Sequence, residues 1–262
     1  MTAYWRLSAA LAVAALVGVG CAGGGSTGAR GYEIGAGYWG VDIKTAEAQH
    51  LGGDNVNLLD TMKIENKDDT YFASVAFSKG LDVYGLGYST VASSGQAILA
   101  ADTTFGGTLF TNGTTVSTSA KTDFYELSLG GRAPEAQSTT TYSFVVRYID
   151  FDVKMYDVAT PTTRAEWNGD GWMLLLGVAY DWAAGSGTMY FVDAKWMDLD
   201  WVRIGHTGGD VLDVYGGIKW SVGGQNASLA VGYRYVDTDL DVSGSKIKFS
   251  YEGPVVGFTA KF

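Results

Sequence analysis

A strict period-two alternation is the feature that most constrains how this chain can fold. Residues 171–182 read GWMLLLGVAYDW. In an extended strand, one face would carry only bulky apolar or aromatic side chains: Trp172, Leu174, Leu176, Val178, Tyr180 and Trp182. The ten residue steps from Trp172 to Trp182 cover about 33 Å, or about 25 Å along the axis at a tilt of roughly 40°. This length spans the apolar layer of a membrane, with aromatic rings at both interfaces.

Two later segments, 212–222 and 229–235, repeat the alternation, and their second faces carry mostly Gly, Ala and Ser with isolated charges. The second face of a soluble sandwich would meet water and be rich in Lys and Glu, whereas a small, partly polar face suits a narrow barrel interior. Composition agrees, since 37 Gly and 16 Tyr against 3 Pro indicate strands and turns. The sequence therefore predicts an all-β fold, a closed antiparallel transmembrane β-barrel.

Charge and rare residues exclude several classes. The net charge of -10 argues against a nucleic-acid partner. One Cys and two His supply too few ligands for a structural zinc site, so no metal and no cofactor are predicted.

Turn signals predict about ten strands, with eight as the alternative. The strands are expected to begin near Gly31, Thr70, Gly80, Thr115, Thr139, Gly169, Thr188, Val211, Ala227 and Ser245. Short connections at 78–80, 183–187 and 222–226 are typical of periplasmic turns, and the long stretches 44–69 and 91–114 of extracellular loops.

The first residues are typical of an export address. Residues 1–20 carry one charge, Arg6, before an apolar run, which predicts an export signal and a location in the bacterial outer membrane. Cys21 stands where lipoproteins are lipidated, and ordinary cleavage after Ala22 is the alternative. Residues 21–30 form a Gly/Ser-rich tether, and 31–262 form the barrel.

The last strand resembles an assembly signal, in which an alternating apolar strand ends in an aromatic residue, here with Phe258 and Phe262. Its apolar residues change from odd to even numbers near Gly253-Pro254, which predicts a β-bulge there.

One pattern occurs at 147–152, 195–200 and 234–239: a basic residue is followed by an aromatic residue and then by two aspartates at alternate positions. The aromatic residue would face lipid, so the basic residue would face the lumen. A charge in a narrow lumen is costly unless it is paired. The predicted lumen charge network is Arg147, Lys195, Arg234, Lys219, Asp193, Asp213, Asp181 and Glu126. Two interpretations stay open, a network that fills the barrel and a charged, selective constriction.

Two further sets follow from the same phases. The aspartates of the repeat predict an acidic outer rim of Asp150, Asp152, Asp198, Asp200, Asp237 and Asp239. This rim either faces water or bridges divalent cations to lipopolysaccharide. The predicted aromatic girdle consists of Trp172, Tyr180, Trp182, Trp196, Trp220, Tyr233 and Tyr235.

With these residues, above all GYRYVDTDLDVSG and GPVVGFTAKF within 169–262, the chain resembles the OmpA/OmpX-like superfamily of small outer-membrane β-barrels. The resemblance implies fold and location, contact with outer-membrane lipid and lipopolysaccharide, and insertion by the outer-membrane assembly machinery. It implies no reaction.

The sequence thus predicts a monomeric, non-enzymatic barrel with a structural or passive small-pore role. Surface binding through the loop 91–114, with Phe105, Leu109 and Phe110, is the alternative. A hydrolase at the rim, with His206 close in sequence to Asp198, Asp200 and Asp210, is a weaker one.

Overall fold

The computed structural model describes residues 30–49, 54–185, 187–198, 207–222, 226–242 and 245–262. Within this part of the chain, no helix has the length and apolarity to cross a membrane. The strands are β1 (Arg30–Gln49), β2 (Asn55–Asn57), β3 (Lys67–Lys79), β4 (Asp82–Ile98), β5 (Thr103–Phe105), β6 (Thr108–Phe110), β7 (Thr115–Pro134), β8 (Ser138–Asp157), β9 (Arg164–Gly185), β10 (Thr188–Asp198), β11 (Thr207–Val222), β12 (Ala227–Val242) and β13 (Ser245–Lys261).

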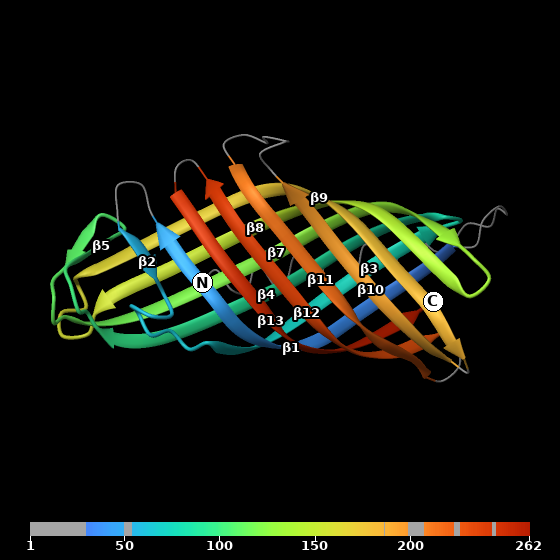
Figure 1. Ribbon diagram of the computed structural model, residues 1–262, viewed down its shortest axis with the longest axis horizontal. Coiled ribbons are helices and arrows are strands. Elements are labelled where there is room, and N and C mark those ends of the chain that lie inside the picture. Colours follow the sequence, from blue (N-terminus) through green and yellow to red (C-terminus); the bar gives the residue numbers. More distant parts are fainter. Residues whose placement is uncertain (1–29, 50–53, 186, 199–206, 223–225, 243–244) are drawn as a thin grey trace.

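Ten strands form the barrel wall, in the order β1-β3-β4-β7-β8-β9-β10-β11-β12-β13, and the pairing of β13 with β1 closes it. Every pairing of neighbouring strands is antiparallel. The predicted closed antiparallel barrel is confirmed, with ten strands and not eight. The short strands β2, β5 and β6 lie at one end of the barrel (Figure 1).

The two ends of the barrel differ in their connections. Gly80, with a φ of 64°, forms the tight turn between β3 and β4, and the connection 135–137 and Gly187 lie at this same end. Tyr32 and Phe262 also meet here, joined by backbone hydrogen bonds of 2.8 and 3.1 Å. Short turns identify this end as periplasmic and the opposite end as extracellular.

Both predicted extracellular loops, 44–69 and 91–114, begin too early, and 44–69 also ends too late, whereas 91–114 ends where β7 begins at Thr115. β1 continues to Gln49 and β4 to Ile98, while β3 already begins at Lys67. The wall therefore extends beyond the membrane layer, because polar residues can still alternate with apolar ones when water replaces lipid outside the barrel.

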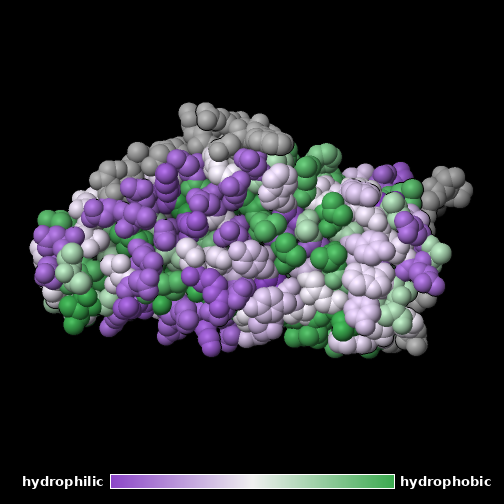
Figure 2. Space-filling view, in the orientation of Figure 1, coloured by the Kyte–Doolittle hydropathy of each residue, from purple (hydrophilic) through white to green (hydrophobic). Residues whose placement is uncertain are grey.

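Exposed apolar and aromatic side chains on the wall strands form an apolar band over the periplasmic part of the outer surface. On the face shown in Figure 2, hydrophilic residues gather over the extracellular part. Aromatic residues lie near both borders of this band. Trp172 and Trp196 lie towards the extracellular ends of their strands, and Tyr233 and Tyr235 lie near the middle of β12. Tyr180, Trp182 and Trp220 lie towards the periplasmic turns. Rings stack here both within β9 and between β9 and β10, since Tyr180 of β9 and Tyr190 of β10 each lie 5.4 Å from Trp182 of β9 between centroids.

The predicted bulge at Gly253-Pro254 is wrong. The register between β12 and β13 runs unbroken from Ala227 opposite Ala260 to Val242 opposite Ser245. The register shift at the β1–β13 seam falls instead in β1, between Ile43 and Thr45.

What changes along β13 is the apolar face, not the side-chain phase. Phe249 and Tyr251 are buried inside the barrel, whereas Val256 and Phe258 point outwards and are exposed. Within the membrane layer the outer face of the strand is apolar because it contacts lipid. Beyond that layer the outer face contacts water, and the apolar side chains lie on the inner face. Gly253 lies at this transition, where a Cβ atom would be 1.8 Å from the carbonyl oxygen of Gly40.

Candidate functional site

A network of charged side chains crosses the lumen where the inner face changes from polar to apolar. Its centre is Arg147 of β8, whose side chain is fully buried. The Arg147 Nε donates a hydrogen bond of 2.8 Å to Glu126 of β7, and the guanidinium also forms ion pairs with Glu126 and with Asp213 of β11. One cation therefore joins two acids from opposite sides of its own strand.

Two further cations complete the network. Arg234 of β12 binds Asp213 through Nε at 3.0 Å and through Nη2 at 2.7 Å. The Lys195 ammonium of β10 lies 2.7 Å from a Glu126 carboxylate oxygen. Five wall strands are thereby linked through ion pairs inside the lumen, where low dielectric strengthens each of them.

Aromatic rings cover the network from the extracellular side. The Arg234 guanidinium lies 4.8 Å from the ring centroid of Trp39, and that of Arg147 lies 5.7 Å from the centroid of Phe124. Both distances allow cation–π attraction.

The remaining predicted network residues lie apart from this centre. Lys219 pairs with Asp181 at 2.7 Å and lies 4.5 Å from the ring centroid of Phe191, nearer the periplasmic end. Asp193 faces the lumen but makes no side-chain hydrogen bond or ion pair with any residue the structure describes. The eight predicted residues thus divide into a central network, a separate pair and one acid that has no ion-pair partner in the described part of the chain.

Above the network, apolar side chains fill the extracellular half of the lumen. Trp39, Phe151, Phe249 and Tyr251 belong to this core and are at most 3% exposed. The Phe249 ring stacks against Phe151 at 5.0 Å and against Tyr251 at 5.6 Å between centroids.

A segment between β1 and β3, residues 54–66, folds into the mouth of the barrel, and we call it the strap. Leu58, Met62 and Ile64 of the strap are buried in the apolar core, and Ile64 pairs with Gly95 of β4. Sequence reasoning missed the strap by treating this stretch as an extracellular loop. Apolar residues at 56, 58, 62 and 64 among polar neighbours were the signal that could have revealed it.

The hairpin of β5 and β6 corrects another expectation. Phe105 and Phe110, expected on a surface loop that binds partners, are buried at 2% and 1% exposure. Leu109 of the same hairpin is 57% exposed. Of these three residues, only Leu109 is therefore available to a partner.

The outer-rim acids within the described residues belong to the outward-facing phase of their strands. Asp152 pairs with Lys154, and Asp239 lies 3.4 Å from the Lys248 ammonium. Among the described residues, no group of three or more His, Cys, Asp or Glu side chains could hold a metal ion. Cys21, Asp200 and His206 lie outside the described residues.

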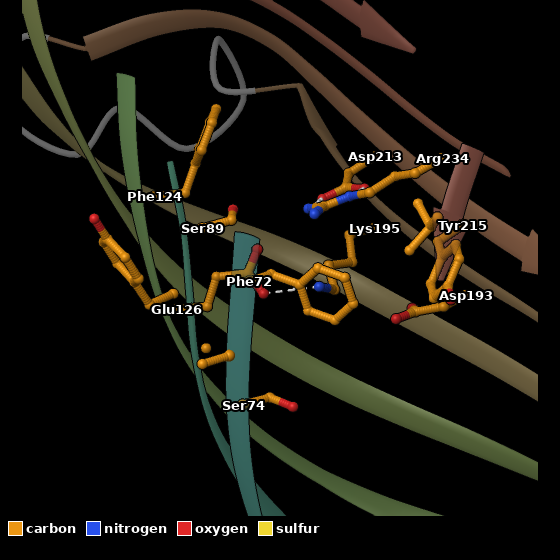
Figure 3. A pocket seen from close by; sticks show the side chains of 14 residues that line it. Phe72, Ser74, Ser89, Phe124, Glu126, Asp193, Lys195, Asp213, Tyr215 and Arg234 are labelled. Atoms are coloured by element: carbon orange, nitrogen blue, oxygen red, sulfur yellow. Dashed lines mark hydrogen bonds and ion pairs between the residues drawn. The ribbon is translucent and has the colours of Figure 1, made fainter. Parts of the chain in front are cut away.

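A cavity of about 190 Å³ lies directly below the apolar core, within the lumen (Figure 3). Its wall includes both partners of two ion pairs, Arg234 with Asp213 and Lys195 with Glu126, together with Asp193. Phe72, Phe124 and Tyr215 contribute aromatic surface.

The closed ten-stranded wall, the apolar band and the two sets of interfacial aromatic rings define an outer-membrane β-barrel protein. Among solved structures, the chain is similar to the outer membrane protease OmpT from Escherichia coli, with 12% identity, 88% of this chain and 97% of that chain covered, and a TM-score of 0.56. Ail, the attachment invasion locus protein of Yersinia pestis, matches with 8% identity, coverage of 89% and 99%, and a TM-score of 0.36. The Pseudomonas putida toluene transporter TodX matches with 9% identity, coverage of 91% and 91%, and a TM-score of 0.37. No family model and no curated protein matches the sequence. The similarity to OmpT concerns the fold alone.

Proposed function

We propose that this protein is a sealed outer-membrane barrel with a structural role in the bacterial envelope. The observation that carries the proposal is the apolar core in the extracellular half of the lumen, which combines wall residues such as Phe151 and Phe249 with the strap and the β5–β6 hairpin. Close-packed apolar side chains leave no path for water, and an ion crossing them would lose its hydration shell. The packing favours the structural interpretation over the small-pore interpretation.

The central charge network supports the same conclusion. A selective constriction needs charges that meet the passing ion, whereas Arg147 is fully buried and paired on two sides. Its ion pairs connect the wall strands and favour a rigid barrel. The apolar band would contact outer-membrane lipid, and the acids at its extracellular border would face the headgroups of lipopolysaccharide.

Refolded protein in planar lipid bilayers should give no steady single-channel conductance, because the apolar core blocks the lumen. The electrophoretic shift between unheated and heated samples, measured on the same preparation, confirms that the silent protein is folded. Regular conductance steps from folded protein would refute the sealed barrel and return the pore interpretation to first place.

The strap should leave the mouth of the barrel when Leu58→Asp places a carboxylate at a position that is 1% exposed. Burying an unpaired charge costs several kcal/mol, more than the packing of one short segment is expected to supply. Limited proteolysis of the folded barrel should then cut within 54–66, where the parent protein resists cleavage. Leu109→Asp, at an exposed position of the β5–β6 hairpin, is the matched control and should leave the cleavage pattern unchanged.

A further inference from the structure

The lumen is divided into two unlike halves, and the cavity lies at their border. Small side chains line the wall from the cavity towards the periplasm. On β3 these are Ser74, Ala76 and Ser78. On other strands of the wall, Gly85 lies next to Ser128, and Gly177 lies next to Ser143. A second cavity of about 70 Å³, lined by Glu33, Arg132 and Lys261, lies at the periplasmic end. Small molecules would therefore reach the larger cavity from the periplasm, since the apolar core closes the other side.

The charges lining the larger cavity do not balance. The lining acids are Glu126, Asp193 and Asp213, and the lining bases are Lys195 and Arg234. Lys195 forms an ion pair with Glu126 and Arg234 forms one with Asp213, each with a nitrogen–oxygen distance of 2.7 Å. The third base of the network, Arg147, is not part of the lining and is held by the same two acids. With Arg147 counted, three acids face three bases, and among the described residues Asp193 is the lining acid that none of these bases contacts at ion-pair distance.

The surroundings of Asp193 suit a cation with an apolar part. The carboxylate faces the cavity beside the ring of Tyr215, and Phe72 contributes a second ring to the same wall (Figure 3). Carboxylates bind ammonium groups through charge-assisted hydrogen bonds, and aromatic faces attract cations and cover alkyl groups. A volume of about 190 Å³ equals roughly six water molecules at about 30 Å³ each, so a short alkylammonium ion fits.

We propose that this cavity is a periplasm-facing binding site for a small organic cation, whose ammonium group pairs with Asp193 while its alkyl part packs against Phe72 and Tyr215. The proposed site rests on the sealed extracellular half in one respect only, because the seal determines that the ligand enters from the periplasm. Conductance measurements test the seal, and the measurements below test the site, so the two can fail separately.

Isothermal titration calorimetry of the refolded full chain in detergent micelles should detect binding of propylammonium, and none of propionate, an anion of similar size. Asp193→Asn should weaken propylammonium binding at least about tenfold, because the negative charge that attracts the ammonium group is lost. Asp170→Asn, which neutralises an outward-facing acid that accepts a hydrogen bond from Tyr148, should leave binding unchanged. Each variant is first tested for the heat-dependent electrophoretic shift. Absent propylammonium binding, equal binding of propionate, or the same affinity in Asp193→Asn would overturn the proposal.

Access to the cavity is tested by chemical modification. In a full chain carrying Cys21→Ser, a thiol introduced by Ser74→Cys should react with 2-aminoethyl methanethiosulfonate about tenfold faster than with the 2-sulfonatoethyl reagent, corrected for their reactivity in solution. Asp193→Asn should reduce this preference several-fold. A thiol that reacts with neither reagent in the folded barrel contradicts periplasmic access, and a preference that Asp193→Asn does not change contradicts the role of Asp193.

Discussion

Replacing Arg147 with methionine should lower the free energy of unfolding by about 3 kcal/mol, because breaking a buried ion pair leaves an uncompensated buried charge. Arg147 is fully buried and paired with both Glu126 and Asp213. Counted together with the neighbouring Asp193, the network holds three acids and three bases, so the loss of Arg147 leaves three acids facing two bases. Each of the two paired acids retains one cation, Lys195 for Glu126 and Arg234 for Asp213, which places the effect at the lower end of the range for buried pairs. Urea unfolding of the barrel in lipid vesicles, followed by tryptophan fluorescence, measures the change.

Two variants separate charge from packing. Lys219→Met removes the cation of a separate pair whose side chains are 33% and 23% exposed, and should cost less than about 1 kcal/mol. Adding Glu126→Gln to Arg147→Met restores the charge balance and should recover at least half of the lost stability. An Arg147→Met barrel as stable as the parent, or no recovery in the double variant, would show that the network does not stabilise the barrel.

Gly253→Ala should prevent proper closure of the barrel. A Cβ at this position would lie 1.8 Å from the carbonyl oxygen of Gly40, and a backbone atom of a paired strand cannot move aside as a side chain can. The β1–β13 seam would have to separate near Gly253, at a cost of about 3 kcal/mol or more, the upper end for inserted methyl groups. The fraction of protein that shows the heat-dependent electrophoretic shift after refolding should fall sharply.

Gly257→Ala is the matched control, because it adds the same methyl group four residues further along the same strand. There the nearest atom to the new Cβ is a ring carbon of Phe72 at 3.4 Å, a side chain that can adjust. We expect normal refolding. If Gly253→Ala refolds as well as Gly257→Ala, the close approach at the seam does not control closure.

Local patterns were sufficient for the wall of this barrel. The alternation over 171–182 predicted a membrane-crossing strand, and β9 contains it with Trp172, Leu176 and Val178 exposed on the outer face. Turn signals predicted a start near residue 245 for the last strand, and β13 begins at Ser245. Such features can be read from sequence because side-chain phase and turn chemistry depend on near neighbours in the chain.

The last strand, β13, shows what a local sequence pattern cannot determine. The exchange of apolar residues from odd to even positions is present in the sequence, and a bulge was one explanation for it. Only the unbroken register against β12 shows that the side-chain phase is constant and that the apolar face itself changes sides. The medium outside the wall, lipid or water, decides which face is apolar, and that depends on the height of each residue in the assembled barrel.

The sequence by itself determined the strands, their phases and the inward direction of Arg147, Lys195 and Arg234, since each follows from alternation. Tertiary structure decided the rest. The burial of Leu58 and Met62 in the mouth, the pairing of Arg147 with acids on two strands, and the position of Asp193 beside the cavity all depend on which side chains meet across the lumen. Those meetings are set by strand stagger and barrel closure, which join residues far apart in the chain and leave no periodic trace in the sequence.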